Sequence, residues 1–505
     1  MSTDRLSNRF RRSARECELV LTSVGTEHFD VLIVGAGISG IGAAFHVQDR
    51  CPGRTYAILE GRDAIGGTWD LFRYPGIRSD SDMHTLGFRF KPWVHEKAIA
   101  DGPSILDYLH ETAEEHGIDA HIRYHHWVKR ASWSSDDARW TVTVDRKDTG
   151  EQVALTCNFL FMCSGYYDYD QGHAPEFEGQ DDFGGERIHP QHWPEDLDYA
   201  GKRVVVIGSG ATAVTLVPAM AETAAHVTML QRTPTYILAA PERDAIANRL
   251  REKLPPQVAY GLTRWKNVFF SQLVYHACQK APDAMRALLK KGVRAYLGDD
   301  FDVEKHFDPP YAPWDQRLCL APEGDIFEAI KRGDASVVTD TIERFTEDGI
   351  LLASGEHLDA DIVVTATGLK LLFLGGMTVD VDGEEVRAQD KMTYKAMMLS
   401  DVPNLALCFG YTNASWTLKA DLTSEYVCRL LNHMDRHGYR YCVPRRDPDV
   451  SEVPFLDFSS GYVQRALEDL PRQGDRTPWR VKQNYLVDVV YLRHAPVDDD
   501  VMQFG

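Results

Sequence analysis

The fold is decided by the stretch Phe29-Asp30-Val31-Leu32-Ile33-Val34-Gly35-Ala36-Gly37-Ile38-Ser39-Gly40. The apolar run up to Val34 predicts a short buried β-strand, and the residues after the glycines predict a helix. In such a strand–turn–helix unit the three glycines allow a tight turn, a close approach of the backbone to a pyrophosphate, and close packing of the helix on the sheet. The stretch therefore predicts a dinucleotide-binding unit.

The residues that follow fit the same unit. A helix is expected over Ile41–Val47 and a second strand over Thr55–Leu59, which ends at Glu60. A carboxylate at this strand tip is placed to bind a ribose hydroxyl. The pattern does not distinguish FAD from NAD.

A second glycine turn, Gly208-Ser209-Gly210-Ala211-Thr212-Ala213, follows the apolar strand expected over Arg203–Ile207. The next strand, Val227–Leu230, is followed by Gln231-Arg232-Thr233-Pro234, with no acid at its tip. Arg232 can pair with a 2′-phosphate, which favours NADPH over NADH, although a solvated surface cation is the alternative. Two such turns in one chain indicate two dinucleotides held face to face, and hence electron transfer between them.

Composition excludes several classes of protein. The chain has 505 residues and a formal charge of −20, which argues against nucleic acid as a partner. Its nine cysteines form no CxxC pair, no zinc spacing and no CxxxxC redox pair, so we expect reduced thiols and neither a metal site nor a disulfide reductase. No apolar run is long enough to span a bilayer.

The N-terminus is rich in arginine, but no apolar segment of the kind found in secretory signals follows it. Residues 1–27 are therefore expected to form a flexible extension. We expect a cytoplasmic protein, with membrane association at its surface as an open alternative.

Two longer motifs carry a family resemblance. Gly66-Gly67-Thr68-Trp69-Asp70 through Arg78-Ser79-Asp80 is the first, and Phe183 to Pro194, with the pattern FxGxxxHxxxWP, is the second. Together they resemble the two fingerprints of the Baeyer–Villiger flavin monooxygenases. The stretches Arg73–Phe88 and Gly410–Trp416 are similar to actinobacterial members of that family.

The resemblance implies an α/β fold with two dinucleotide-binding (Rossmann-like) domains, the NADP domain being inserted in the FAD domain. The FAD domain would comprise residues 28–167 and 360–505, and the NADP domain residues 168–359. Asp361–Gly368 is expected to be the strand that returns to the FAD domain, and Phe159–Gly165 the strand that leaves it. The second motif would be a hinge, with His189 as a hydrogen-bonded structural residue.

The resemblance also implies the chemistry. FAD, reduced by NADPH, would react with molecular oxygen to give a C4a-peroxyflavin that converts ketones to esters and oxygenates sulfur in thioethers and thioamides. The substrate is expected to be small and lipophilic. The alternatives are a flavin N-/S-monooxygenase that makes no esters, and a non-catalytic FAD- or NADPH-binding sensor.

By the same resemblance Arg317 is the active-site cation and Asp80 the carboxylate that orients it. Without the resemblance, an ordinary interdomain ion pair explains Arg317 equally well. Asn413 and Trp416 are further pocket candidates, and Gln316 stands where family members often have lysine. The residues predicted to bind FAD or NADP are Gly35, Gly37, Ser39, Gly40, Glu60, Thr68, Trp69, Asp70, Leu71, Arg78, Ser79, Asp80, Val128, Gly208, Ser209, Gly210, Ala211, Thr212, Ala213, Arg232 and Thr233.

A helical insert is expected over residues 243–298. Its central part, Val258–Cys278, is apolar and aromatic, and basic residues surround it. The simpler interpretation is a helical subdomain that packs its apolar face internally. The alternatives are contact with a membrane surface and the lining of a tunnel for lipophilic substrates.

Overall fold

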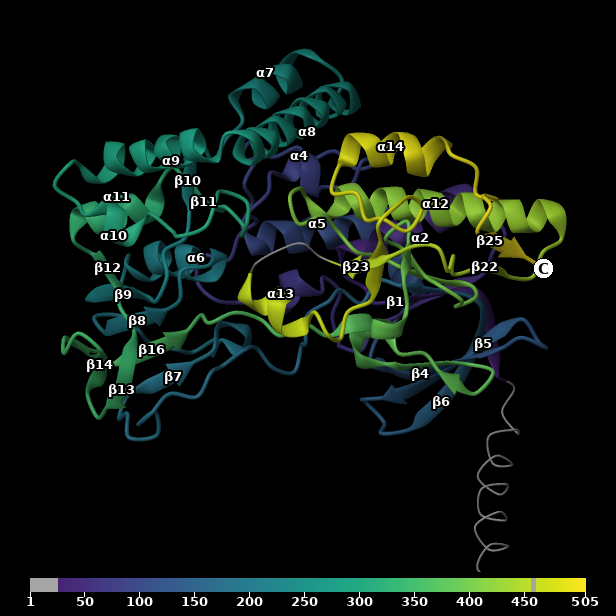
Figure 1. Ribbon diagram of the computed structural model, residues 1–505, viewed down its shortest axis with the longest axis horizontal. Helices are drawn as coiled ribbons and strands as arrows, with labels where there is room; N and C mark the ends of the chain where they lie inside the picture. The colour runs from purple at the N-terminus through teal and green to yellow at the C-terminus, as the bar shows by residue number, and fades with distance from the viewer. Residues whose placement is uncertain (1–25, 456–459) are drawn as a thin grey trace, which may run out of the picture.

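A computed structural model describes residues 26–455 and 460–505 of the chain. The flexible extension expected over residues 1–27 lies outside the described residues except for its last two positions, and Glu27 already begins the first strand. The described chain forms two lobes, the first built on a mixed sheet and the second on a parallel sheet, with a helical segment above the junction between them (Figure 1). The predicted fold class, an α/β protein with two Rossmann-like units, is confirmed.

The first lobe contains a nine-stranded sheet in the order β18-β17-β4-β5-β6-β1-β2-β3, with β21 paired to β6. Apolar residues on β1, β2 and β6 are buried on both faces of this sheet, as expected for parallel strands covered by helices. The strands are β1 (Glu27–Val34), β2 (Tyr56–Leu59), β3 (Ile122–Arg123), β4 (His126–Ser134), β5 (Arg139–Arg146), β6 (Gln152–Met162), β17 (Thr378–Val381), β18 (Glu384–Glu385) and β21 (Leu405–Leu407).

Helices α2 (Ile38–Arg50) and α12 (Trp416–His437) pack together on one face of that sheet (Figure 1). Other helices of the lobe are α3 (Thr68–Leu71), α4 (Met83–Leu86), α5 (Gly102–Glu115), α13 (Gly461–Ala466), α14 (Tyr485–His494), and the 3₁₀ turns at Asp119–His121, Phe373–Gly376 and Ala388–Asp390. Short strand pairs complete it: β19 (Thr393–Tyr394) with β20 (Met398–Leu399), β22 (Cys442–Pro444) with β25 (Met502–Phe504), and β23 (Glu452–Pro454) with β24 (Arg472–Gly474).

The second lobe contains a five-stranded parallel sheet in the order β12-β9-β8-β16-β7. Its strands are β7 (Glu186–Ile188), β8 (Arg203–Ile207), β9 (His226–Gln231), β12 (Ala335–Thr339) and β16 (Ile362–Thr365). Two smaller sheets accompany it: β10 (Ile237–Ala240) with β11 (Cys319–Pro322), and β13 (Ile342–Thr346), β14 (Gly349–Leu352) and β15 (His357–Asp359). The helices are α6 (Ala211–Met220), α10 (Val303–His306), α11 (Asp325–Arg332) and a 3₁₀ turn at Pro190–His192.

One strand assignment from the sequence is wrong. Ile362–Thr365, expected to return the chain to the first lobe, is β16 and pairs in parallel with β8 and β7 of the second sheet. The return follows it, between Thr365 and β17. An apolar strand before a glycine has the same pattern in either sheet, so sequence alone could not assign it.

The outgoing and returning connections lie side by side. The Asp168 backbone N–H donates to Lys370 O (2.9 Å), Leu372 N–H to Tyr166 O (2.9 Å), and His173 N–H to Gly368 O (3.0 Å). The two lobes are therefore joined by a short two-chain ladder, and the cavity described below opens beside it.

Residues 243–298 contain three helices: α7 (Ala245–Lys253), α8 (Pro256–Lys280) and α9 (Pro282–Leu297). Internal packing accounts for only part of the apolar surface of α8, because a row of its large apolar side chains is exposed. Within residues 26–455 and 460–505, no helix combines the length and apolarity needed to cross a bilayer.

Candidate functional site

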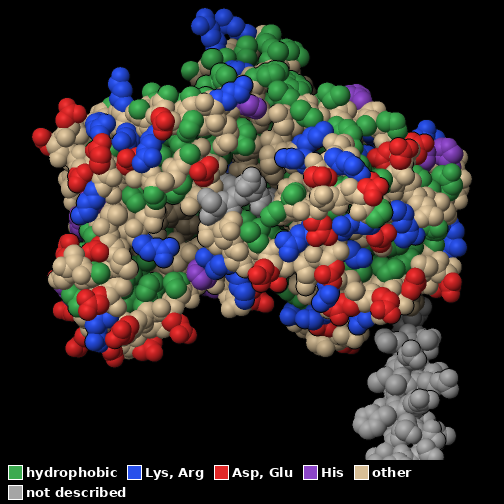
Figure 2. Space-filling view, in the orientation of Figure 1, with side chains coloured by type: hydrophobic (Ala, Val, Ile, Leu, Met, Phe, Trp, Pro, Cys, Tyr) green, Lys and Arg blue, Asp and Glu red, His purple; other side chains and the backbone are tan. Residues whose placement is uncertain are grey.

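One cavity of about 1000 Å³ lies between the two lobes and receives residues from both glycine turns. Figure 2 shows the surface hollowed at this junction. Its size is at the upper end of the range for small-molecule sites. The predicted site residues that line it are Gly35, Gly37, Ser39, Glu60, Thr68, Trp69, Arg78, Ser79, Asp80, Val128, Gly208, Ser209, Gly210, Ala211, Thr212, Arg232, Thr233 and Arg317.

The first glycine of each turn is required by the fold of the chain. Gly35 has φ +103°, and a Cβ there would lie 2.6 Å from Cys163 O. Gly208 has φ +136°, and a Cβ there would lie 2.3 Å from Ala366 O. Side chains are excluded from both positions by the backbone conformation and by the neighbouring strand.

The second glycine of each turn is different. Gly37 has φ −78°, and a Cβ there would have only ordinary contacts, the nearest being 3.6 Å from Gly67 Cα. Gly210 has φ −77°, and a Cβ there would have no heavy atom within 4 Å. Neither glycine is needed by the protein itself, and both face the cavity at a helix N-terminus. These are the positions where a pyrophosphate approaches the backbone in such a turn, so the turns fit dinucleotide ligands.

Glu60 is buried at the tip of β2 and supports the first turn. Its carboxylate accepts hydrogen bonds from the backbone N–H of Ala36 (2.7 Å) and of Arg62 (2.9 Å). Burial raises the pKa of Glu60, and these two hydrogen bonds oppose that shift. Glu60 lines the cavity, and each of its oxygens keeps a second acceptor site for a ribose hydroxyl.

The turn is also held from the C-terminal part of the chain. The Trp416 indole N–H donates to Ser39 Oγ (2.7 Å), and Tyr166 stacks on Trp416 with ring centroids 5.1 Å apart. Trp416 lines the cavity as expected. Asn413 does not, since it is buried and its amide donates to Gln483 O (2.9 Å).

Four predicted cofactor-binding residues do not line the cavity. Gly40 lies on the buried face of α2 and Ala213 on the buried face of α6, where small residues allow each helix to pack closely. A Cβ on Gly40 would lie 1.8 Å from Gly35 O. The Asp70 carboxylate is paired with Arg62 (2.5 Å) and Arg73 (2.9 Å), and Leu71 packs against the core of the second lobe. These residues shape the site without facing it.

In the second lobe, Arg232 is exposed at the cavity wall just beyond β9. Among the described residues its guanidinium makes no hydrogen bond or ion pair. Ser209 Oγ donates to Thr233 O (2.9 Å), which ties the glycine turn to the segment that carries Arg232. A cation without a protein partner beside a dinucleotide turn is suited to an anionic group on the ligand.

Arg317 and Asp80 come from different parts of the chain and form a two-contact ion pair. Arg317 Nε lies 2.5 Å from Asp80 Oδ2, and its terminal nitrogen donates to Oδ1 at 2.9 Å. Both side chains are 34% exposed, toward the cavity. Desolvation acts to lower the pKa of Arg317, but Asp80 and the phenols of Tyr462 and Tyr166 outweigh it and raise the pKa. The guanidinium is therefore a permanent cation that still faces the cavity.

A group of aromatic residues that the sequence did not single out surrounds this pair. Tyr166 and Tyr167 share a hydrogen bond between their hydroxyls (2.9 Å), and burial raises the pKa of both. Tyr462, from the C-terminal segment, lines the same wall. Their positions in the sequence carry no motif, so only the fold brings them together.

Arg78 lines the cavity, but its guanidinium is paired with Asp325 at the start of α11. It therefore links the two lobes and is not a free cation for a phosphate. From the sequence both Arg78 and Arg232 are predicted to bind a cofactor. In the structure they differ, because Arg78 has an ion-pair partner.

In the motif from Phe183 to Pro194, the part His189–His192 contacts the two-chain ladder. His189 Nε2 lies 3.3 Å from Gly368 O, and its Nδ1 accepts from the backbone N–H of Gln191 (3.2 Å). Burial lowers the pKa of His189. Both ring nitrogens are engaged and His189 is absent from the cavity wall, which agrees with a structural role.

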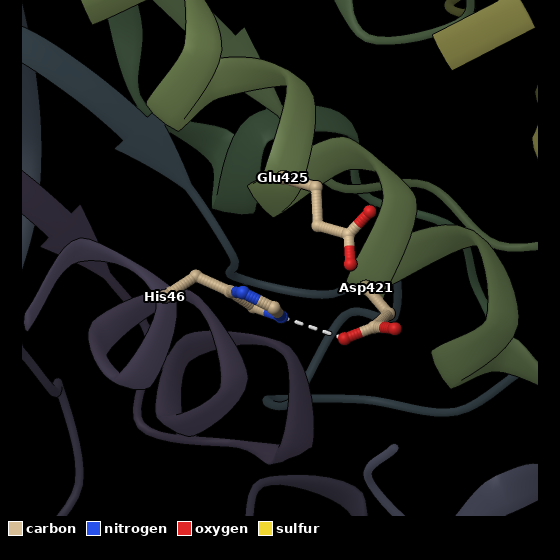
Figure 3. Close-up of side chains that lie close together, drawn as sticks. All are labelled: His46, Asp421 and Glu425. Carbon is tan, nitrogen blue, oxygen red and sulfur yellow. Dashed lines mark hydrogen bonds and ion pairs between the residues drawn. The ribbon is translucent and has the colours of Figure 1, made fainter. Parts of the chain in front are cut away.

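A second cluster of polar residues lies apart from the cavity. His46 Nε2 on α2 donates to the carboxylate of Asp421 on α12 at 2.6 Å, with Glu425 one turn further (Figure 3). The carboxylates of Asp421 and Glu425 are also paired with Arg89, and Glu425 is paired with two further arginines, Arg50 and Arg493. A divalent cation would have to displace these arginines, so the cluster is an ion-pair network that joins α2, α12 and α14.

The chain is similar to known flavoproteins over nearly its whole length. A profile described as "Flavin-binding monooxygenase-like" matches residues 94–247, and one described as "NAD(P)-binding Rossmann-like domain" matches residues 33–96. The "FAD-containing monooxygenase EthA" of Mycobacterium tuberculosis is 59% identical over 95% of this chain and 98% of its own. The "Putative FAD-containing monooxygenase MymA" of the same organism is 52% identical, covering 95% and 98%.

Among solved structures, the oxidised steroid monooxygenase bound to NADP superposes with a TM-score of 0.73 at 23% identity. The match covers 94% of this chain and 99% of that one. At this identity the match concerns the fold, and it includes both lobes.

Proposed function

The chain belongs to the FAD-containing monooxygenases, and on that basis we propose that it uses NADPH and molecular oxygen to convert lipophilic ketones to esters and to oxygenate sulfur. Both reactions transfer one oxygen atom to the substrate and reduce the other to water, with two electrons from NADPH. The observation that carries the proposal is the pair of glycine turns that face one cavity, with Arg317 and Asp80 in its wall.

FAD would bind at the turn of Gly37 and Glu60, and NADP at the turn of Gly210 and Arg232. Bound there, FAD supplies the electron transfer to oxygen. The predicted cofactor-binding residues Ser39, Thr68 and Val128 also line the cavity. We propose the domain division expected from the sequence, with the second boundary placed between Thr365 and Thr378.

The chemical role proposed for Arg317 follows from its charge and its fixed position. In ester formation a negative charge develops on oxygen as the ketone carbonyl is attacked and a tetrahedral adduct forms. A permanent cation that is fixed before the reaction stabilises this charge without reorganisation. Asp80 holds two of the guanidinium nitrogens, which leaves the remaining N–H groups to face the cavity.

The test of the proposed function is product analysis with linear, cyclic and aryl ketones and a thioether. Esters from at least one ketone class, formed with oxygen and NADPH, are the expected result. Sulfoxide from the thioether with no ester from any ketone would favour an N-/S-monooxygenase. No product with either class, despite bound FAD, would favour a sensor.

We expect the purified protein to be yellow because it retains FAD. The turn at Gly37, the N-terminus of α2 and Glu60 together supply the contacts that a pyrophosphate and a ribose need. The measurement is the visible absorption spectrum of the purified protein, followed by release of the flavin and its identification as FAD. A colourless protein that does not change the fluorescence of added FAD would contradict this prediction.

We expect Arg232→Ala to raise the KM for NADPH by roughly 10- to 100-fold, since a hydrogen-bonded charge pair with the 2′-phosphate is lost. The KM for NADH should change little, because NADH lacks that phosphate. Steady-state oxidation of both coenzymes is the measurement. Lys129→Glu, at an exposed position on β4 in the sheet of the first lobe, is the control. Equal losses for the two coenzymes would remove the assignment.

A further inference from the structure

The outward face of α8 carries an exposed apolar row. Val258, Leu262, Trp265, Phe269 and Leu273 recur every three or four residues and so share one side of the helix, with Phe270 beside them. Phe269, Phe270 and Leu273 are 57%, 65% and 68% exposed. We call these six residues the α8 row. Figure 2 shows hydrophobic side chains gathered at the top of the molecule, where Figure 1 has α7 and α8.

The opposite face of α8 is firmly packed. The Tyr260 hydroxyl donates to Phe88 O (3.0 Å), and Arg264 donates to His84 O (2.9 Å) and Gly87 O (2.8 Å). The exposed row is therefore not the result of a loosely attached helix. A contiguous apolar row held out into water is unfavourable and is typical of a contact surface.

The exposed apolar surface extends beyond α8. The ring centroids of Trp265 and of Tyr485, at the start of α14, lie 6.1 Å apart. Two further apolar residues on α14, Val487 and Val490, are exposed. The surface is thus wider than one helix.

The charge of this region is opposite to that of the whole chain. Residues 245–297 contain ten lysines and arginines and two acidic residues, whereas the chain carries a net charge of −20. Four of these cations are exposed and have no hydrogen bond or ion pair within the described ranges: Arg249, Lys253, Lys280 and Lys291.

We propose that the α8 row docks on the surface of a membrane containing anionic lipids. Tryptophan, phenylalanine and leucine on one face, with lysine and arginine around it, are the features of a helix that lies in the membrane interface. A two-fold contact between copies of the chain would bring the same free cations of the two copies together, which is unfavourable. Anionic lipid satisfies both the apolar row and the cations.

The docking face lies close to the segments that carry the Arg317–Asp80 pair. Asn267 of α8 donates to Asp82 Oδ1 (2.8 Å), two residues after Asp80. Tyr275 of α8 packs edge-on against Trp314, three residues before Arg317, with ring centroids 5.9 Å apart. If the proposed function holds, docking brings this end of the enzyme to the phase in which lipophilic substrates concentrate.

The test is flotation of the full-length, FAD-loaded protein with lipid vesicles. We expect the protein to float with vesicles of equal parts phosphatidylcholine and phosphatidylglycerol. Binding should be about tenfold weaker with phosphatidylcholine alone, and weaker at high salt. The triple variant Phe269→Ser, Phe270→Ser, Leu273→Ser should bind the anionic vesicles about tenfold less or weaker still. Lys280→Glu with Lys291→Glu should reduce the preference for anionic lipid.

Matched controls are Tyr439→Ser, an exposed aromatic residue just after the C-terminal end of α12, and Lys129→Glu. Both should bind vesicles like the unchanged protein. NADPH oxidation by the triple variant in lipid-free buffer reports its folding, and vesicle binding is scored independently of any product. The proposal is overturned if the unchanged protein does not float, or if the triple variant floats equally well. It is also overturned if the α8 row proves to mediate a dimer, detected by ultracentrifugation and lost in the triple variant, without vesicle binding.

Discussion

Arg317→Ala should lower the rate of ester formation by roughly 100- to 1000-fold, the usual loss when one fixed group that stabilises a developing oxyanion is removed. The substitution removes the cation that faces the cavity and leaves the Asp80 carboxylate without its partner. A second negative charge then faces the charge that develops on the substrate. Both effects raise the free energy of the transition state.

Oxidation of NADPH should persist in the same variant. The glycine turns at Gly37 and Gly210 do not depend on Arg317, so both coenzymes should still bind. Oxygen that has taken up the two electrons of NADPH but is not transferred to the ketone should be released as hydrogen peroxide. The measurement is ester formed per NADPH consumed, with hydrogen peroxide assayed in parallel.

Two conservative variants separate charge from position. Arg317→Lys keeps the cation and loses the two-contact geometry, and Asp80→Asn keeps the arginine and loosens its orientation. We expect both to lose less ester formation than Arg317→Ala. If Arg317→Ala makes ester at nearly the original rate and coupling, the catalytic cation must be sought elsewhere in the cavity.

The sequence predicted the two glycine turns well because their chemistry is local. Strand, turn and helix follow one another within about a dozen residues, and each step has a local signal in apolar runs and glycines. The positions of Glu60 and Arg232 could be predicted for the same reason. Each residue stands just after the strand that follows the helix of its glycine turn, β2 for Glu60 and β9 for Arg232. The pairing of Arg317 with Asp80 could be expected only through the family resemblance, because the two residues are 237 positions apart in the sequence.

The features that could not be predicted from the sequence depend on tertiary contacts between distant segments of the chain. Asp70 and Arg78 are residue types that often bind cofactors, yet both are already in ion pairs within the protein. Asp70 is paired with Arg62 and Arg73. Arg78 is paired with Asp325. The strand Ile362–Thr365 is assigned to its sheet only by its pairing with β8 and β7. Apolar content alone indicated that α8 would pack, and only its orientation shows which of its residues remain exposed.

The second large effect concerns the glycines that the fold itself does not need. Gly37→Ala should give a stable, folded protein that does not retain FAD. The backbone at Gly37 suits alanine, and the new methyl would make only ordinary contacts, so the FAD-free protein should be as stable as before or about 0.5 kcal/mol more stable. Flavin should nevertheless be lost, because the methyl would occupy the space that the pyrophosphate needs next to the backbone.

Gly210→Ala gives the complementary result. A methyl there meets no protein atom, so the variant should fold, bind FAD and be yellow. Its flavin should no longer be bleached by NADPH, while dithionite should still reduce it. Gly292→Ala on α9, where a methyl also meets nothing, is the matched control and should behave like the unchanged protein. Flavin content, thermal unfolding of the FAD-free forms, and anaerobic reduction by NADPH are the measurements.

These outcomes show whether each glycine is needed for coenzyme binding or for folding of the chain. If Gly37→Ala retained its flavin, the pyrophosphate would not approach the turn there, and the assignment of the first site would fail. If Gly210→Ala were reduced by NADPH at the original rate, the second turn would not hold the coenzyme. If either variant failed to fold although Gly292→Ala folded normally, the glycine would be serving the fold of the chain. A methyl at Gly37 or Gly210 meets no close protein contact, so the loss expected from each substitution is that of a single coenzyme, with the protein still folded.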